Sequence, residues 1–240
     1  IEAFIHGAMC VSVSGRCFTS QFLFNKSANR GECIHPCRRL YNVKDEEGNE
    51  LKIDNNFVFS AKDLCTLPFI EKLKKADIKA FKIEGRNREP EYVYTVTRIY
   101  RKAIDKKLTK QELEKSLEEL KKVYNKGFSS GFYLRTPTSD DFARTENSSS
   151  TQTKEFIGKI YHYYPKIKVG LLKLNAGKLK IGDEIFIIGK TTGLLKIKIE
   201  SMQSNHQFIN EAKKGDEIGI RLPINSVCRK NDEVYRIIGK

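Results

Sequence analysis

The sequence lacks the features that mark membrane proteins and several common classes of hydrolase. No run of about 18 apolar residues occurs, which excludes a membrane-spanning helix. No charged, then apolar, then small-residue leader opens the chain, so we expect a cytoplasmic protein. Only 4 histidines are present, and neither an H-E-x-x-H motif nor a P-loop is found. These absences exclude a zinc peptidase of the common H-E-x-x-H type and a GTPase that uses a P-loop.

The composition is that of a chain which can fold into one large domain or two ordinary ones. It has 240 residues, of which 39% are hydrophobic and 31% are charged, so a core can form beneath a heavily charged surface. The first residue is Ile1 rather than Met, and residues 1–5 have the pattern of a strand already in progress. We therefore expect an N-terminal part of the same protein upstream of Ile1.

The charge is strongly positive. Lys and Arg number 44 against 30 Asp and Glu, a net charge of +14 that is spread through both halves. Such a surface favours polyanions, of which tRNA is the partner we expect, whereas solvated lysine side chains are the simpler explanation. No membrane partner is expected. The candidate RNA-binding lysines are Lys166, Lys168, Lys173, Lys178, Lys180, Lys190, Lys196 and Lys198.

Residues 1–142 predict strands that alternate with helices, which is typical of an α/β fold with parallel strands. We expect strands at residues 2–6, 56–60 and 78–84, and a short helix at residues 67–75. A second helix has Pro90 at its first position and one apolar face, formed by Tyr92, Val93, Val96, Ile99, Tyr100, Ala103 and Ile104. A third helix follows the capping box of Thr109 and Glu112.

Residues 143–155 are polar and rich in Ser and Thr, which predicts a linker. Short β runs then recur through residues 156–240, a spacing that predicts a small all-β barrel. Two segments, 180–187 and 214–220, each use a Gly-Asp turn to begin a strand. This pattern resembles domain II of translation GTPases such as elongation factor Tu.

Five of the six cysteines fall within residues 10–65, with spacings C-x6-C, x15-C, x3-C and x27-C. Zinc sites usually show paired C-x2–4-C knuckles, which only Cys33 and Cys37 approach. A cubane cluster needs four thiolates from separate loops, which irregular spacing permits. The spacing alone leaves an iron–sulfur cluster, a zinc site and structural or free thiols open. Cys228 stands alone and is expected to be a buried small hydrophobe.

Five segments of the first half form a recognisable set: residues 2–10 (EAFIHGAMC), 15–20 (GRCFTS), 29–33 (NRGEC), 60–65 (SAKDLC) and 82–86 (KIEGR). Together they resemble the peptidase U32 family, over about residues 2–135. The pattern departs from the family only mildly, at Thr19, where an aliphatic residue is preferred. The resemblance implies the C-terminal part of a β/α barrel, so the expected fold is a partial (β/α) barrel over residues 1–142 followed by the small β-barrel.

The resemblance also implies a [4Fe–4S] cluster. By position, its ligands are Cys10, Cys17, Cys33 and Cys65, with Cys37 as a competitor. Arginines near these cysteines, namely Arg16, Arg30 and Arg38, could offset the negative charge of the cluster. They could equally hold a carboxylate or phosphate group through bidentate hydrogen bonds.

Lys82, Glu84 and Arg86 alternate along a predicted strand, so their side chains share one face at its C-terminal end. In a β/α barrel that end carries the active site, which makes the three residues catalytic candidates. A structural salt bridge between Lys82 and Glu84 is the simpler alternative. His6 ends the first strand and is a fourth candidate, although a lone histidine is more often structural.

The function that the resemblance implies is twofold. Relatives hydroxylate a wobble uridine of tRNA in a prephenate-dependent way, and others are named collagenase-like peptidases that act on a protein substrate. The cysteines, the cationic residues and the basic chain fit tRNA modification, with prephenate as the associated ligand. The peptidase alternative needs an activated nucleophile, for which His35 between Cys33 and Cys37 is a weak signal. A non-catalytic RNA-binding accessory domain is the second alternative.

Overall fold

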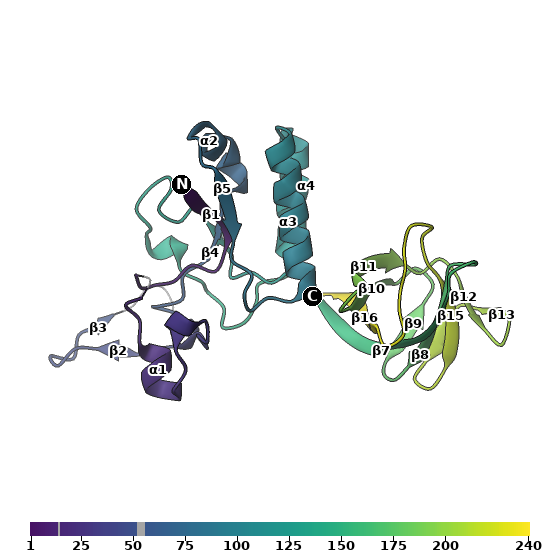
Figure 1. The fold of residues 1–240 in the computed structure, drawn as a ribbon. Coiled ribbons are helices and arrows are strands. Elements are labelled where there is room, and N and C mark those ends of the chain that lie inside the picture. Colours follow the sequence, from purple (N-terminus) through teal and green to yellow (C-terminus); the bar gives the residue numbers. More distant parts are fainter. Residues whose placement is uncertain (14, 52–55) are drawn as a thin grey trace. The chain divides into compact units, whose positions relative to one another are not determined.

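The structure is a computed structural model that describes residues 1–13, 15–51 and 56–240. The chain forms two compact units, residues 1–150 (unit 1) and residues 151–240 (unit 2), which are described separately (Figure 1). Among the described residues, no helix is long and apolar enough to cross a membrane.

Unit 1 is built on a four-stranded sheet in the order β5-β1-β4-β6. Its strands are β1 (Glu2–Gly7), β4 (Asp63–Cys65), β5 (Ala80–Ile83) and β6 (Phe128–Ser129). β1 pairs with β5 and β4 pairs with β6 in parallel, whereas β1 and β4 are antiparallel. The mixed α/β class is as predicted, but a partial (β/α) barrel is not confirmed, because barrels of that type have parallel strands throughout.

The helices of unit 1 begin where the sequence places their signals. They are α1 (Thr19–Phe24), α2 (Ile70–Lys75), α3 (Pro90–Asp105) and α4 (Lys110–Lys122). Pro90 occupies the first turn of α3, and Thr109 forms the predicted capping box with Glu112 at the start of α4. The buried face of α3 is narrower than predicted, since Val93 remains 42% exposed.

One predicted strand of unit 1 is wrong. Residues 56–60 form a turn, in which the Ser60 N–H donates to the Phe57 carbonyl at 2.9 Å. Phe57 and Val58 are consecutive and both buried, which the alternating faces of a strand do not allow when only one face is covered. The strand of this region is β4, and an isolated bridge joins Ala61 to Phe142.

The other elements of unit 1 are short. They are the 3-10 turns η1 (Ala28–Arg30), η2 (Pro36–Arg38), η3 (Leu67–Phe69) and η4 (Ser139–Asp141), and the hairpin of β2 (Val43–Lys44) and β3 (Glu50–Leu51). Within the predicted linker, the Ser149 N–H donates to the Asn125 carbonyl at 2.7 Å, so this part packs on unit 1. The long strand β7 (Gln152–Tyr164) already begins inside the 143–155 range.

Unit 2 is all β, as predicted. Its main sheet has the order β11-β10-β16-β7-β8-β15-β12-β13, with antiparallel pairing between neighbours. The strands after β7 are β8 (Val169–Leu174), β9 (Lys178–Lys180), β10 (Glu184–Gly189), β11 (Gly193–Lys198), β12 (Met202–Ser204), β13 (Gln207–Ile209), β14 (Glu211–Lys213), β15 (Glu217–Arg221) and β16 (Glu233–Gly239). A closed barrel like domain II of elongation factor Tu is not confirmed, because β11 and β13 each pair with one strand among the described residues.

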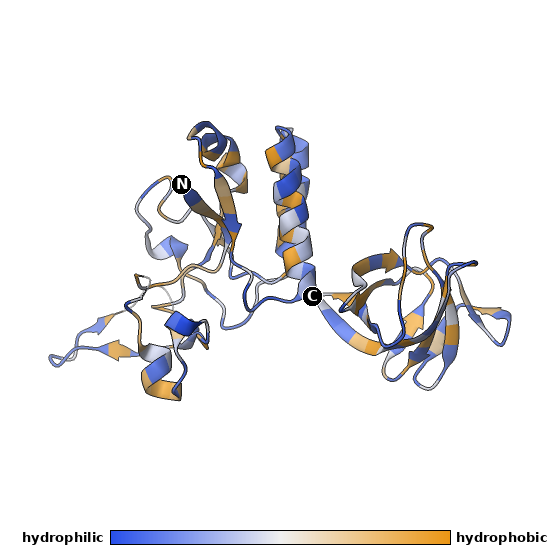
Figure 2. Cartoon of the chain, viewed as in Figure 1, coloured by the Kyte–Doolittle hydropathy of each residue, from blue (hydrophilic) through white to orange (hydrophobic). Residues whose placement is uncertain are grey.

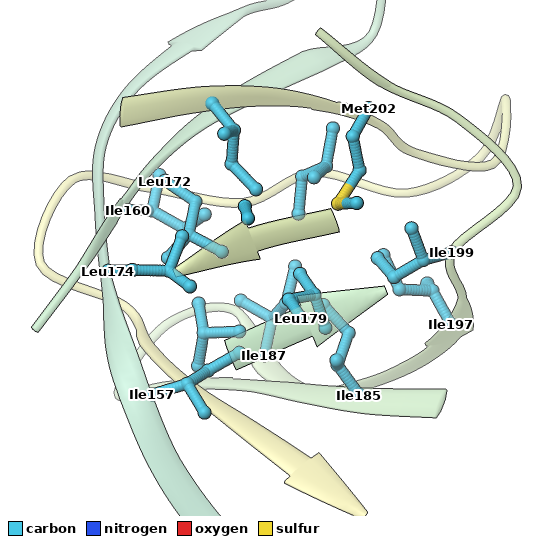
Figure 3. Close-up of a cluster of buried hydrophobic side chains, with 14 of the residues drawn as sticks. Ile157, Ile160, Leu172, Leu174, Leu179, Ile185, Ile187, Ile197, Ile199 and Met202 are labelled. Carbon is cyan, nitrogen blue, oxygen red and sulfur yellow. The ribbon is translucent and has the colours of Figure 1, made fainter. Parts of the chain in front are cut away.

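Two features of the sequence account for this sheet. Apolar residues alternate along its strands, so that Ile157, Leu172 and Ile185 are fully buried in one cluster (Figures 2 and 3). The two predicted Gly-Asp turns recur, with Asp183 and Asp216 each accepting a hydrogen bond from the backbone N–H three residues earlier, at 2.9 and 2.8 Å. The glycines of both turns have positive φ, which other residues rarely adopt.

Candidate functional site

A cavity of about 1270 Å³ lies within unit 1. Its walls come from the end of β1, the loop that follows, α1, the loop around η2 and the chain after β5. Because β1 and β5 are parallel neighbours, their carboxyl ends meet at the same edge of the sheet and contribute to one wall. The predicted residues that line this cavity are His6, Cys10, Arg16, Cys17, Cys33, Arg38, Lys82, Glu84 and Arg86, together with Cys37.

Four cysteines gather in this cavity: Cys10, Cys17, Cys33 and Cys37. Burial raises the pKa of the Cys37 thiol, the Arg38 guanidinium lowers it, and Cys10, Cys33 and Cys17 each raise it further, so Cys37 lies within electrostatic range of the other three sulfurs. All four thiols are free. The loops thus place four soft sulfur donors from separated positions in the sequence along the lining of one cavity.

Hydrogen bonds surround these sulfurs. The backbone N–H groups of Ser12 and His35 donate to Cys10 Sγ and Cys33 Sγ, each at 3.4 Å. The Cys17 thiol lies 3.4 Å from Thr19 Oγ1, and this contact lowers the pKa of Cys17. Hydrogen bonds to thiolate sulfur stabilise its negative charge, which is the state that binds metal.

Cys65 lies apart from this group. Its side chain is 4% exposed in the hydrophobic core, and the Tyr100 hydroxyl donates to its sulfur at 3.7 Å. Burial raises the pKa of the Cys65 thiol to about 11, so the residue is held as a neutral thiol. Cys228 is likewise buried, in the core of unit 2.

The three arginines predicted to lie near a cofactor have different surroundings. Arg38 donates to the carbonyls of Met9, at 2.6 Å, and Ala61, so it ties the chain after β1 to the chain before β4. Arg16 is exposed and lines the cavity. Arg30 is the last residue of η1, is exposed and does not line the cavity.

The chain at the end of β5 supplies the cationic wall. Lys82 pairs with Glu2 at 3.7 Å and lies over the Phe4 ring at 4.9 Å, rather than pairing with Glu84. Glu84 instead accepts a hydrogen bond from the Arg86 backbone N–H at 2.9 Å. The Glu84 backbone is fixed in turn, because its own N–H donates to the His6 carbonyl at 2.8 Å.

Gly31 leaves room for the Arg86 side chain. A Cβ on Gly31, which has φ of +86°, would lie 2.9 Å from Arg86 Nη1. The absence of a side chain at Gly31 therefore lets the guanidinium lie against this loop and face the cavity. This contact joins the N-R-G-E-C segment to the K-I-E-G-R segment in space.

His6 of β1 is buried and also lines the cavity. It is 1% exposed, and its ring centroid lies 5.4 Å from that of Tyr100, 5.5 Å from Phe128 and 6.1 Å from Tyr92. Its Nδ1 is 3.3 Å from the Tyr100 hydroxyl. Burial, with a further contribution from Arg88, lowers the pKa of His6 to about 3, so the imidazole is neutral at physiological pH.

Two charged residues of this region were not predicted from the sequence. Arg88 lines the cavity and stacks over the Tyr124 ring at 3.8 Å. Asp63 is 1% exposed, its Oδ2 accepts from the Lys126 N–H at 3.2 Å, and its Oδ1 has no partner in the structure described. Burial raises the pKa of Asp63, whereas Arg88 and Arg38 lower it. Arg88 continues the alternation of Lys82, Glu84 and Arg86, which is the signal that could have identified it.

The cavity lining also includes exposed apolar side chains. Phe22 of α1 is 83% exposed, and Val13 and Phe132 are 74% and 75% exposed. The cavity therefore combines clustered thiols, a cationic wall and exposed rings. Such a combination suits a soft metal centre beside a ligand that is both anionic and apolar.

Comparisons with known proteins show what this chain is similar to. The chain is 42% identical over 241 residues to a collagenase of Porphyromonas gingivalis, covering 98% of this chain and 58% of that protein. It is 35% identical over 198 residues to the tRNA hydroxylation protein P1 of Bacillus subtilis, covering 79% of this chain and 46% of that protein. The chain thus spans about half the length of these relatives.

A solved structure aligns with part of this chain, and a family model matches more than half of it. The C-terminal domain of a putative U32 peptidase from Geobacillus thermoleovorans aligns with 34% of this chain and 91% of its own, at 14% identity and a TM-score of 0.32. The model of peptidase family U32 matches residues 1–142, which contain the whole cavity. The chain therefore belongs to peptidase family U32.

Proposed function

We propose that this chain is part of an RNA-modifying enzyme, in which Cys10, Cys17, Cys33 and Cys37 hold a [4Fe–4S] cluster. The observation that carries this proposal is the grouping of these four thiols on one cavity beside a cationic wall. The tRNA hydroxylation protein of Bacillus subtilis, with 35% identity over most of this chain, supports tRNA hydroxylation as the reaction. Hydroxylation of a wobble uridine is the specific form that we propose.

The donor set fits the cluster. Four cysteine thiolates are the usual ligands of a [4Fe–4S] centre, and the N–H groups of Ser12 and His35 already point at two of these sulfurs. No group of three or more His, Cys, Asp or Glu side chains in the described ranges converges as a single metal ion would need. A cubane differs, because it binds each thiolate at a separate iron. When bound, the cluster would supply electron transfer.

The remaining residues of the cavity bind and orient a ligand in this proposal. Lys82, Arg86 and Arg16 can hold carboxylate groups, and the exposed rings of Phe4 and Phe132 can pack against an apolar ring. Prephenate, which has two carboxylates and a six-membered ring, matches this division. Glu84 fixes the turn that carries Arg86.

Matched cysteine variants test the ligand set. Anaerobically reconstituted protein should contain iron and sulfide and absorb broadly at about 400 nm. Cys37→Ser should remove this absorbance, whereas Cys65→Ser and Cys228→Ser should retain it, because both of these thiols lie in hydrophobic cores. An absorbance lost with Cys65→Ser and kept with Cys37→Ser would reverse the assignment.

The reaction is tested in cells with the intact gene. Deletion should abolish hydroxylation of wobble uridine in tRNA, measured by mass spectrometry of nucleosides, and wild-type but not Cys37→Ser protein should restore it. Normal hydroxylation in the deletion strain would reject the proposed reaction.

A collagenase-like peptidase is the second candidate, and the 42% identity to a named collagenase favours it. The geometry gives it less support, since within the described ranges no serine or cysteine side chain is hydrogen-bonded to a histidine side chain. A protease nucleophile needs such a base. Gelatin cleavage by protein freed of trace proteases, with normal tRNA in the deletion strain, would favour the peptidase.

A further inference from the structure

The outer face of unit 2 carries aromatic residues that belong to neither core nor cavity. Leu172 points into the core (Figure 3), so its neighbour Leu171 lies on the outer face of the sheet. A register shift between Ile160 and His162 places His162 opposite Leu171, on this outer face. A row of five outward positions crosses β7, β8, β15, β12 and β13 in register: His162, Leu171, Gly219, Gln203 and Phe208. Phe208, at the far end of the row, is 76% exposed.

A second outward row lies beside the first. Tyr164 pairs with Val169 across β7 and β8, and Val169 pairs with Arg221 across β8 and β15. Tyr164 is 44% exposed, and its ring centroid lies 4.4 Å from that of His162 in an edge-to-face arrangement. The two rows together form what we call the aromatic face: His162, Tyr164, Phe208, Gly219 and Arg221.

Gly219 lies in the middle of the first row and adds no side chain to this face. A Cβ at this position would lie 3.2 Å from Val169 Cγ1 and 3.7 Å from Leu171 Cδ2, so a larger residue would have to displace these two side chains. The backbone of Gly219 does not need glycine for its φ, since it is not among the residues with positive φ. A glycine inside a strand often marks a bulge, a tight bend, or a place where a ligand or another backbone approaches closely, and the pairing of β15 with β8 is regular at Gly219.

The charges around the aromatic face are positive. The acidic residue Glu217 of β15, on the same face, is paired with Lys173 at 3.2 Å and is hydrogen-bonded to Tyr161. Arg221, Lys166 and Lys168 have no acidic partner among the residues that the structure describes. Of the lysines predicted to bind RNA, Lys180 and Lys196 are also paired, with Glu211 and Glu184. Three cations, Lys166, Lys168 and Arg221, therefore lie without an acidic partner around the turn between β7 and β8 and at the end of β15. Among the described residues Lys178, Lys190 and Lys198 also have no acidic partner, but they lie on or next to β9, β10 and β11.

We infer that the aromatic face binds unpaired bases of an RNA loop, by stacking on Tyr164 and Phe208 while Arg221, Lys166 and Lys168 contact phosphates. Every base has a flat π-face, and exposed rings beside cations are the usual platform for single strands. Charge complementarity favours this partner over a collagen-like peptide, which offers neither phosphates nor bases. This inference rests on the proposed RNA function and names the RNA element that unit 2 holds.

Binding of a labelled single-stranded RNA to the whole chain, followed by fluorescence anisotropy, tests the inference. The double variant Tyr164→Leu, Phe208→Leu keeps apolar side chains but removes both rings, and should bind about 5-fold or more weakly. Tyr164→Phe, which keeps the ring, should bind like the parent. Gly219→Val should weaken binding without changing any charge, and a duplex of equal length should bind more weakly than the single strand.

Salt dependence tests the phosphate contacts. Arg221→Gln should flatten the slope of log affinity against log salt by about 0.7, as expected for one phosphate contact of a single strand. Lys214→Gln removes the same charge from the exposed turn before β15 and should leave the slope unchanged. Circular dichroism of each variant should match the parent, because the substituted side chains are exposed or lie on the outer face.

Three outcomes would overturn the inference: parental affinity in the double leucine variant, equal binding of single strand and duplex, or competition by a collagen-like peptide for the same face. These are distinct from failure of the proposed function. If the leucine variant binds like the parent while the gene deletion still abolishes tRNA hydroxylation, only the aromatic face is wrong. If deletion leaves hydroxylation normal, the reaction is wrong whatever the binding results are.

Discussion

Acidification should destabilise unit 1 through His6. The pKa of this imidazole is about 3 in the folded protein against an ordinary 6.5, because burial disfavours the charged ring. Between these two values the unfolded chain binds a proton that the folded chain does not, so stability is lost as pH falls below 6.5. At pH 5 the loss is about 2 kcal/mol, from 1.5 pH units at about 1.4 kcal/mol each.

Urea denaturation followed by helical circular dichroism measures this loss. All four α-helices described lie in unit 1, so the helical signal reports this unit alone. The free energy of unfolding should fall by about 2 kcal/mol more between pH 7 and pH 5 in the parent than in His6→Asn, which cannot titrate. His162→Asn, an exposed histidine of unit 2, is the matched control and should behave like the parent.

The comparison isolates His6 from its neighbours. Burial raises the pKa of Asp63 and lowers that of His35, and both effects remain in the variant. An equal loss in the parent and in His6→Asn would refute the reasoning, since it would mean that the buried imidazole does not resist protonation.

Three further predictions concern stability. Thr109→Ala removes the capping box of α4 and should cost about 1 kcal/mol by the same helical signal, and no change would refute the role of the cap. Leu172→Ala leaves a cavity in the core of unit 2 and should cost about 2–5 kcal/mol, measured by hydrogen exchange of β7 and β8 peptides. Gly158→Ala would place a Cβ 2.0 Å from the Lys173 carbonyl oxygen and should lower the same protection, and parental protection would show that the strands can separate there.

Local signals in the sequence determined most of the elements. Pro90 and the Thr109 capping box mark helix starts through the chemistry of the first turn, which neighbouring residues supply. The two Gly-Asp turns of unit 2 need only positive φ at glycine and an aspartate that accepts a nearby N–H. The buried residues of β8 and β10 follow from alternation along a single strand.

The sequence predicted less well those features of the fold that depend on contacts between distant segments. Residues 56–60 have the composition of a strand, but they form a turn in which the consecutive residues Phe57 and Val58 are both buried. The sequence also did not predict the order and direction of the strands in unit 1, where β1 and β4 are antiparallel while β1 and β5 are parallel. Pairing depends on contacts between distant segments, which periodicity within one segment does not report.

The site shows the same division. The sequence by itself determined that cysteines, arginines and the K-I-E-G-R segment were the residues to examine, because their chemistry is explicit in their types. Only the tertiary structure decided that Cys37 joins Cys10, Cys17 and Cys33 on one cavity while Cys65 enters the core. The reason is that burial and proximity depend on how loops far apart in the chain pack against one sheet, and spacing along the chain does not fix that packing.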